Sequence, residues 1–168
     1  MLYILIAIAI FIFLQWRSRR NLNTDPYQVV RHIDGDTTIF RDCRNNKEFR
    51  VRYLVIDANE RHQAGGPEAT RYLATLLPTG SRAFISFTGN KSHDRHEATV
   101  YRKGKDINLE MLLAGHAVID DRYMGRISPA MRSQYRAALK HAQSRKLGRW
   151  SKRSHQQSPQ EFRTKKIT

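Results

Sequence analysis

Five charged residues within a short stretch of the chain have the types and spacing to do chemistry on a phosphate. Asp34 and Asp36 form one acidic cluster, Asp57 and Glu60 form a second, and Arg52 lies between them in a run rich in β-branched and aromatic residues. Carboxylate oxygens are ligands for Ca²⁺ and Mg²⁺. A guanidinium binds a phosphate through two parallel hydrogen bonds. The pattern therefore indicates a place where a hard cation and a phosphate meet.

Each part of this pattern also has a plainer interpretation. Asp-Gly-Asp is common in ordinary turns, which favours Asp34 as a turn former over a second acid of the site. Arg52 could simply face solvent from a strand. In an ideal strand, Arg52 and Asp57 are five residues apart and point to opposite faces. A shared site therefore requires the strand to bend or end before Asp57.

The composition favours a single domain with a polyanionic partner. The chain has 168 residues, and 30 Lys and Arg against 15 Asp and Glu give a net charge of +15. Such an excess points to nucleic acid or an anionic membrane surface. Cys43 is the one cysteine, so an internal disulfide is excluded.

The N-terminal segment predicts a membrane anchor. Residues 1–16 are almost entirely apolar and would form a helix of about 24 Å, and Arg17, Arg19 and Arg20 follow directly. A secretory signal peptide would instead carry its basic residues before the apolar run. We therefore expect an uncleaved single-pass transmembrane helix, with a basic and polar linker over 17–26. The positive-inside rule places the domain on the cytoplasmic side, although export is an open alternative.

The rest of the chain reads as an α+β domain over residues 27–150, followed by a disordered basic tail over 151–168. Apolar periodicity and turn residues predict these boundaries. The expected strands are 27–33, 37–41, 48–56, 82–87 and 97–102, and the expected helices are 66–77, 108–114 and 128–146.

Four motifs, taken in order, resemble the thermonuclease (staphylococcal-nuclease-like) family. They are IDGDT, VRYLVIDANE, GPEA, and an arginine, Arg95, ahead of the strand that contains Tyr101. The resemblance implies an OB-fold, a five-stranded β-barrel with about three α-helices, whose surface commonly binds nucleic acid.

The resemblance also implies a metal site. It makes Asp36 and Asp57 side-chain ligands and assigns a backbone carbonyl ligand to Ala58, where the family usually has threonine. The expected metal is Ca²⁺, with Mg²⁺ as an alternative. Glu60 matches the family's glutamate and would act as general base or orient the attacking water.

Two arginines and a tyrosine complete the implied site. Arg52 and Arg95 match the family's phosphate-binding arginines. Tyr123 matches a nucleotide-contacting tyrosine, although a structural aromatic at the barrel edge is an equal alternative. The chain departs from the family at Asn59, which replaces a proline that would stiffen the turn, and at His96 beside Arg95.

The resemblance implies a metal-dependent nuclease, and the apolar N-terminal segment adds a membrane anchor to this prediction. The nuclease would hydrolyse DNA and RNA with little sequence specificity and leave 3′-phosphates. A second hypothesis is a catalytically weak OB-fold module that binds nucleic acid at a membrane, supported by the net charge of +15. A third treats the basic tail and the arginines after the anchor as lipid-binding elements.

Overall fold

The computed structural model describes residues 25–151 and 157–165. The predicted anchor over 1–16 and most of the predicted linker lie outside the described residues. Within the described part of the chain, every helix is too short or too polar to cross a membrane.

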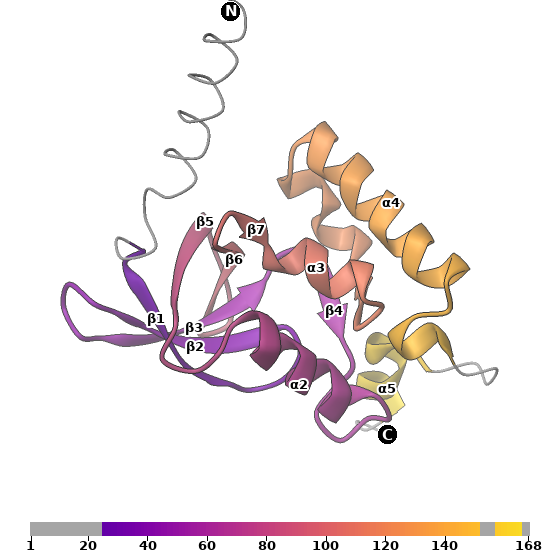
Figure 1. Cartoon of the computed structure of the whole chain (residues 1–168), viewed down its shortest axis with the longest axis horizontal. Coiled ribbons are helices and arrows are strands. Elements are labelled where there is room, and N and C mark those ends of the chain that lie inside the picture. Colours follow the sequence, from indigo (N-terminus) through magenta and orange to yellow (C-terminus); the bar gives the residue numbers. More distant parts are fainter. Residues whose placement is uncertain (1–24, 152–156, 166–168) are drawn as a thin grey trace, which may run out of the picture.

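The described elements alternate short strands with helices (Figure 1). In chain order they are β1 (Tyr27–His32), β2 (Thr37–Asp42), β3 (Glu48–Tyr53), β4 (Ile56–Ala58), α2 (Gly66–Leu76), β5 (Arg82–Ser92), β6 (Arg95–Arg102), β7 (Lys105–Asp106), α3 (Ile107–Leu113), β8 (Ala117–Ile119), the 3₁₀-helix η1 (Asp121–Arg126), α4 (Pro129–Ser144), the 3₁₀-helix η2 (Gly148–Ser151) and α5 (Pro159–Lys165). The prediction of an α+β chain is confirmed.

The main sheet has the strand order β3-β2-β1-β5-β6-β7, and a parallel pairing of β3 with β6 joins strands far apart in that order. β3, β2, β1, β5 and β6 therefore form a closed ring of pairings. Alternate residues of these strands point inward, so that Val51, Tyr53, Ala98 and Val100 are fully buried. Arg52 and Arg95 belong to the opposite, outward-facing set.

The predicted strand over 48–56 is two strands separated by a sharp bend. β3 ends at Tyr53, Leu54 and Val55 form a turn, and β4 begins at Ile56. Val55 adopts the left-handed backbone conformation with φ of 70°, which is unusual for a β-branched residue. The bend lets β4 leave the ring and pair with β8. In a straight strand, the side chains of Arg52 and Asp57 would point to opposite faces. The bend lets them meet on the same side.

α2, α3 and α4 pack against the strands, and α3 and α4 lie side by side (Figure 1). α2 begins with Pro67 in its first turn and buries Ala69 and Leu73. α4 begins at Ser128, whose side chain accepts a hydrogen bond from the Met131 N–H. These packed helices hold the ring and β4 in fixed relation.

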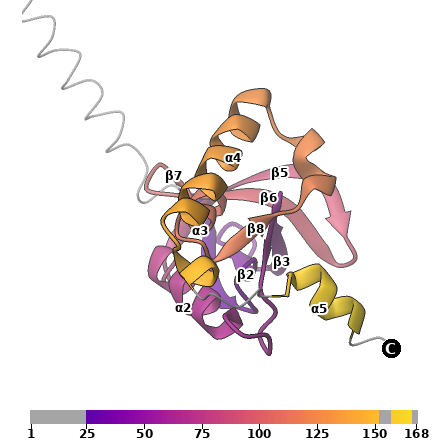
Figure 2. The same cartoon turned by 90° about the vertical axis from the view of Figure 1, so that its right-hand side faces the viewer.

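The prediction of a disordered tail over 151–168 does not hold for Pro159–Lys165, which form helix α5. Ser158 Oγ accepts from the Glu161 N–H at 3.2 Å, and Glu161 Oε2 accepts from the Ser158 N–H at 2.7 Å. This reciprocal pair is a capping box that starts the helix. In Figure 2, α5 lies beside the strands and apart from α4.

Candidate active site

The centre of the site is an arginine held between two buried aspartates. Arg52 Nη1 donates to Asp36 Oδ1 and Arg52 Nη2 donates to Asp57 Oδ1, both at 2.9 Å. Arg52 is 8% exposed, Asp36 2% and Asp57 4%. The structure thus brings together three of the residues that the sequence singled out, one each from β3, β4 and the turn before β2.

Main-chain groups fix the orientation of Asp36. The Ala58 N–H donates to Asp36 Oδ2 at 2.9 Å, and the Tyr53 N–H donates to the Asp36 carbonyl at 2.8 Å. Asp34 Oδ1 accepts from the Asp36 N–H at 3.0 Å. This bond two residues along the chain is that of an Asx-turn, in line with Asp34 as a turn former.

Two glycines let the separate motifs approach one another closely. A Cβ on Gly35 would lie 2.7 Å from Ala58 Cβ and 2.8 Å from Ala69 Cβ, and a Cβ on Gly66 would overlap the Glu60 carbonyl oxygen. The Asp-Gly-Asp turn, the segment after β4 and the start of α2 therefore pack directly against each other. These contacts explain why the motifs require glycine there.

Asn59 stiffens the turn where the family pattern has proline. Its Nδ2 donates to the Ala64 carbonyl at 2.6 Å, and its Oδ1 accepts from Arg149 Nη1 at 2.8 Å. Asn59 is 3% exposed, so both bonds form in a buried setting. Side-chain hydrogen bonds thus replace the missing ring, and they tie the turn to η2.

Glu60 reaches the same site, and a residue that the sequence did not single out holds it there. Arg163 Nη1 donates to Glu60 Oε1 at 2.6 Å, while Arg163 Nη2 donates to Asp57 Oδ2 at 2.7 Å. Arg163 lies in the basic tail more than 100 residues from its partners. The capping pattern at Ser158 and Glu161 could have indicated a helix, but no local signal indicated this contact.

Arg95 lies at the start of β6 without a close partner in the cluster. Its Nε donates to the Ser92 carbonyl at 3.5 Å and its Nη2 to Ser92 Oγ at 3.4 Å, both long for hydrogen bonds. The parallel register pairs Arg50 with Arg95 and Arg52 with Glu97. Arg95 and Arg52 therefore share one face of the sheet, on neighbouring strands.

Tyr123 lies in η1 under two arginines, with the Arg126 guanidinium 4.7 Å and the Arg122 guanidinium 5.5 Å from its ring centroid. Arg126 also forms an ion pair with buried Glu97. Tyr123 itself packs against the core.

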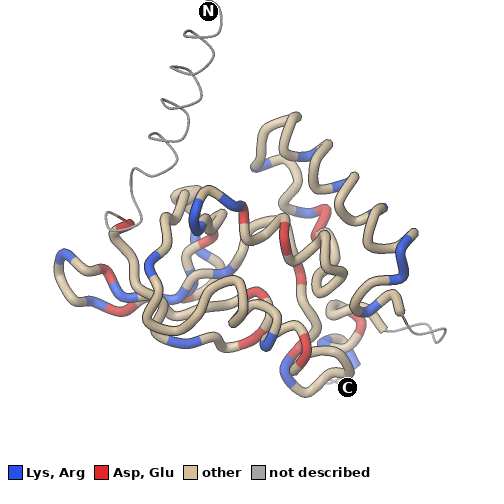
Figure 3. The backbone as a smooth tube through the Cα atoms, viewed as in Figure 1, with Lys and Arg blue, Asp and Glu red and all other residues tan. Residues whose placement is uncertain are grey.

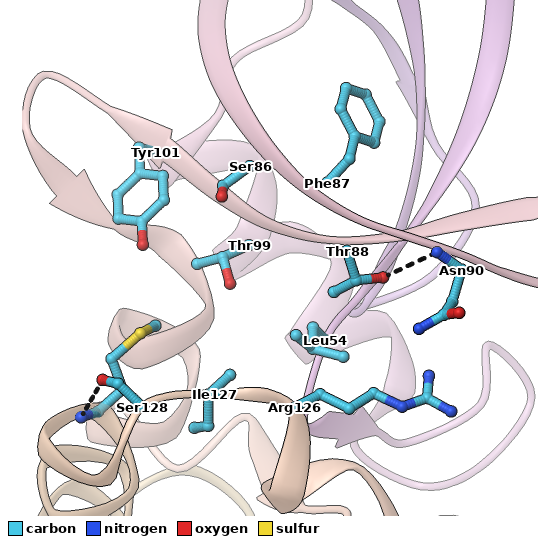
Figure 4. Close-up of a pocket in the computed structure, with 11 residues that line it drawn as sticks. Leu54, Ser86, Phe87, Thr88, Asn90, Thr99, Tyr101, Arg126, Ile127 and Ser128 are labelled. Carbon is cyan, nitrogen blue, oxygen red and sulfur yellow. Dashed lines mark hydrogen bonds between the residues drawn. The ribbon is translucent and has the colours of Figure 1, made fainter.

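A pocket of about 420 Å³ opens next to Arg126, between β5, β6 and the start of α4 (Figure 4). Its lining is mostly polar and includes Ser86, Thr88 and Thr99 from the strands. Arg126 extends along its rim toward Asn90, while the ring of Phe87 points away from it (Figure 4). The pocket extends the polar surface beyond the carboxylate cluster.

Burial and charge oppose each other at Asp36. Burial raises the pKa of Asp36 to about 7, Arg52 lowers it, and the neighbouring charges of Asp34 and Asp57 raise it further. Burial alone would lower the pKa of Arg52, but Asp36 and Asp57 outweigh burial and raise it. Arg52 is therefore a permanent cation, and the pKa of Asp36 lies above the usual range of an aspartate.

The donor set is compatible with a hard cation. Two carboxylates and a main-chain carbonyl are the ligand types that Ca²⁺ prefers. The Arg163 guanidinium, which is itself a cation, forms ion pairs with Asp57 and Glu60. In the described part of the chain, no three His, Cys, Asp or Glu side chains converge as metal ligands would. Any such ion would thus rely on Asp36, Asp57, backbone oxygen and water.

Comparison with known proteins assigns the chain to a family. The sequence model of the staphylococcal nuclease homologue family matches residues 50–152. The chain belongs to this family, which confirms the predicted resemblance, and the matched residues include the last three of the four motifs.

Named relatives agree with this assignment. The chain is 31% identical over 140 residues to an uncharacterized endonuclease of Haemophilus influenzae, covering 83% of this chain and 74% of that protein. It is 33% identical over 132 residues to a probable endonuclease of Botryotinia fuckeliana, covering 71% of this chain and 49% of the relative. A probable endonuclease of Sclerotinia sclerotiorum matches to the same extent. The chain spans about half the length of these fungal relatives.

Proposed function

We propose that the protein is a metal-dependent nuclease that hydrolyses phosphodiester bonds of DNA and RNA with little sequence specificity and leaves 3′-phosphates. The single observation that carries the proposal is the cluster of Asp36, Arg52 and Asp57 with Glu60 beside it. Membership of the staphylococcal nuclease homologue family and relatives named as endonucleases support it. We propose further that the closed ring of five strands is an OB-fold barrel.

Asp36, Asp57 and the carbonyl of Ala58 would hold the metal. When bound, Ca²⁺, or Mg²⁺ in its place, supplies positive charge that stabilises the negative charge on the phosphoryl oxygens. Glu60 accepts a proton from the attacking water, whose oxygen then forms the new bond to phosphorus. The P–O5′ bond breaks, so the phosphate stays on the 3′-oxygen.

The arginines act on the phosphate. Arg52 and Arg95 project from the same face of β3 and β6, so both can donate to the phosphoryl oxygens as their negative charge increases. Arg95 also stabilises the departing 5′-oxygen until it gains a proton. To donate hydrogen bonds to the substrate phosphate, Arg52 must give up some of its hydrogen bonds to Asp36 and Asp57.

The charge of the chain supports a nucleic-acid substrate. Lys and Arg occur on the β2–β3 hairpin, along α4 and close to the C-terminal end (Figure 3). On α4, Arg136 and Lys140 are exposed. Such positions attract the phosphate backbone regardless of base sequence. Tyr123 would contact a nucleotide at the edge of the site.

We also propose that residues 1–16 anchor the domain to a membrane as a single-pass helix with the domain on the cytoplasmic side. The apolar run and the three arginines after it support this arrangement. Protease added outside intact cells should leave the domain undigested. Digestion from outside would place the domain on the opposite side.

The nuclease proposal is tested on the purified full chain in mild detergent. Single-stranded DNA and RNA are incubated with millimolar Ca²⁺, with and without a chelator, beside a Glu60→Gln, Arg95→Ala double variant. We expect cleavage that requires the metal, ends in 3′-phosphates and is lost in the double variant. Intact substrate at millimolar Ca²⁺ would contradict the proposal.

The second candidate function is a membrane-tethered module that binds nucleic acid with little catalysis. The contacts of Arg163 with both Asp57 and Glu60 favour it, because they occupy two groups that cleavage needs. Salt-dependent binding of single-stranded DNA without cleavage would support this function. Metal-dependent cleavage would exclude it.

A further inference from the structure

The Arg163 guanidinium is a cation that binds two carboxylates of the site, one of which, Asp57, is a proposed metal ligand. It donates to Asp57 Oδ1 at 3.1 Å and Oδ2 at 2.7 Å, and to Glu60 Oε1 at 2.6 Å. Asp57 Oδ1 also accepts from Arg52. All hydrogen bonds described for the Asp57 carboxylate thus come from guanidinium groups, so a divalent ion at this carboxylate must compete with the positive charge of Arg163.

The charges of the site show why a cation is held there. Without Arg163, Asp36 and Asp57 would share the guanidinium of Arg52, and Glu60 would lose its ion pair with Arg163. A buried excess of negative charge is costly, and a bidentate guanidinium relieves it. A divalent cation held by Asp36 and Asp57 relieves the same excess, so Arg163 and a metal compete for the Asp57 carboxylate.

The helix that carries Arg163 is short and lies near the surface. α5 has seven residues, a length that is marginal for an isolated helix, and Pro159 is its buried residue. Its N-terminal side is fixed through the Gln157 carbonyl, which accepts from Gln63 Nε2 at 2.7 Å and Arg149 Nη2 at 3.1 Å. Most of its described side chains are exposed or half-buried, as expected of a segment that opens locally.

We propose that α5 is an autoinhibitory latch: Arg163 occupies the metal ligand Asp57 and the general base Glu60, and metal binding at Asp57 displaces the helix. This inference rests on the proposed function of the site. The latch keeps the nuclease inactive at low metal concentration, because the metal must compete with the guanidinium. It differs from a role of Arg163 in binding phosphate, which would make Arg163 necessary for cleavage.

Calcium titration calorimetry on the full chain tests the latch. Arg163→Ala should bind Ca²⁺ at least about tenfold more tightly than the parent, because the competing guanidinium is gone. Thr164→Ala is the matched control, since Thr164 Oγ1 donates within α5 to the Gln160 carbonyl. It should bind Ca²⁺ as the parent does. Equal or weaker binding in Arg163→Ala would overturn the latch.

Amide hydrogen exchange of residues 159–165 in the parent provides a second measurement. Added Ca²⁺ should speed the exchange of these amides, as should Arg163→Ala without Ca²⁺. If the parent binds Ca²⁺ and cleaves DNA while these amides keep their protection, the latch is wrong and the nuclease proposal stands. If neither chain binds Ca²⁺ or cleaves DNA, both are wrong. Slower cleavage by Arg163→Ala at saturating Ca²⁺ would identify a phosphate-binding residue instead.

Discussion

Arg52 and Asp57 are five residues apart on what the sequence predicts as one strand, yet a hydrogen bond of 2.9 Å joins their side chains. The turn at Leu54 and Val55 makes this possible by separating β3 from β4. The same guanidinium also bonds Asp36, so a single arginine pairs with two buried carboxylates. The stability of the fold and the chemistry of the site therefore depend on the same residue.

Replacing Arg52 with alanine should strongly destabilise the protein. The change leaves Asp36 without its cation, and leaves Asp57 with Arg163 alone, so we expect a loss of about 3 kcal/mol in the free energy of unfolding. Urea denaturation measures it. The control is Arg71→Ala, because Arg71 pairs with Glu68 on the exposed surface and should cost less than about 1 kcal/mol. Equal losses in the two variants would contradict the account.

Replacing Gly66 with alanine should damage both stability and cleavage. The new methyl group would overlap the Glu60 carbonyl and force the start of α2 away from the site. We expect a loss of about 1–3 kcal/mol in the free energy of unfolding together with slower cleavage. Gly125→Ala is the control, since a Cβ there meets no heavy atom within 4 Å among the described residues. A Gly66→Ala variant as stable and active as this control would refute the packing argument.

Arg95 should matter for cleavage and not for stability. Its hydrogen bonds to Ser92 are long, so Arg95→Ala should change the free energy of unfolding by less than about 0.5 kcal/mol. Loss of one charge-stabilising donor should lower kcat about 10²-fold. Arg50→Ala is the control, because Arg50 lies opposite Arg95 in the register and pairs with exposed Asp94. Similar losses of kcat in both variants would argue against a specific role for Arg95.

His32 should make stability depend on pH. Its ring nitrogens lie 2.8 Å from Thr38 Oγ1 and 2.8 Å from the Leu77 carbonyl. Burial lowers the pKa of His32 below its usual 6.5, against the opposing effects of the Leu77 carbonyl and Asp34. A depressed pKa in the folded state means that the neutral ring stabilises the fold. This contribution is full above about pH 6.5 and is lost as pH falls through the folded pKa.

The test compares the parent with His32→Gln by urea denaturation at about pH 7.5 and about pH 5.5. The difference in free energy of unfolding between the two proteins should shrink at the lower pH. The subtraction removes the contributions of the other histidines. A difference that stays constant or grows on acidification would show that His32 does not act in this way.

Much of the site could be predicted because its residues lie in short motifs near the bend. Asp36, Arg52, Asp57 and Glu60 all come from a stretch of 25 residues in the sequence, and the structure brings them together. The bend at Leu54 and Val55 was predicted only as a condition that must hold if the side chains of Arg52 and Asp57 are to reach one site. No local sequence pattern indicates that the buried residue Val55 adopts a positive φ, because tertiary packing overrides the strand propensity of valine there.

The contact of Arg163 could not be predicted because it joins segments more than 100 residues apart. Polar composition made its segment resemble a disordered tail. Seven residues of helix carry too few apolar positions to reveal a period. Asn59 is a similar case: its identity indicated a weakened turn, and only the structure shows the bonds to Ala64 and Arg149 that replace the proline.

The most direct test of the site is the single-turnover cleavage rate of Glu60→Gln on single-stranded DNA at saturating Ca²⁺. The amide cannot accept the proton of the attacking water, so the rate should fall about 10²- to 10⁴-fold. Glu68→Gln, an exposed position on α2, should cleave at the parent rate. A Glu60→Gln variant that cleaves as fast as the parent would contradict the assignment of this cluster as the active site.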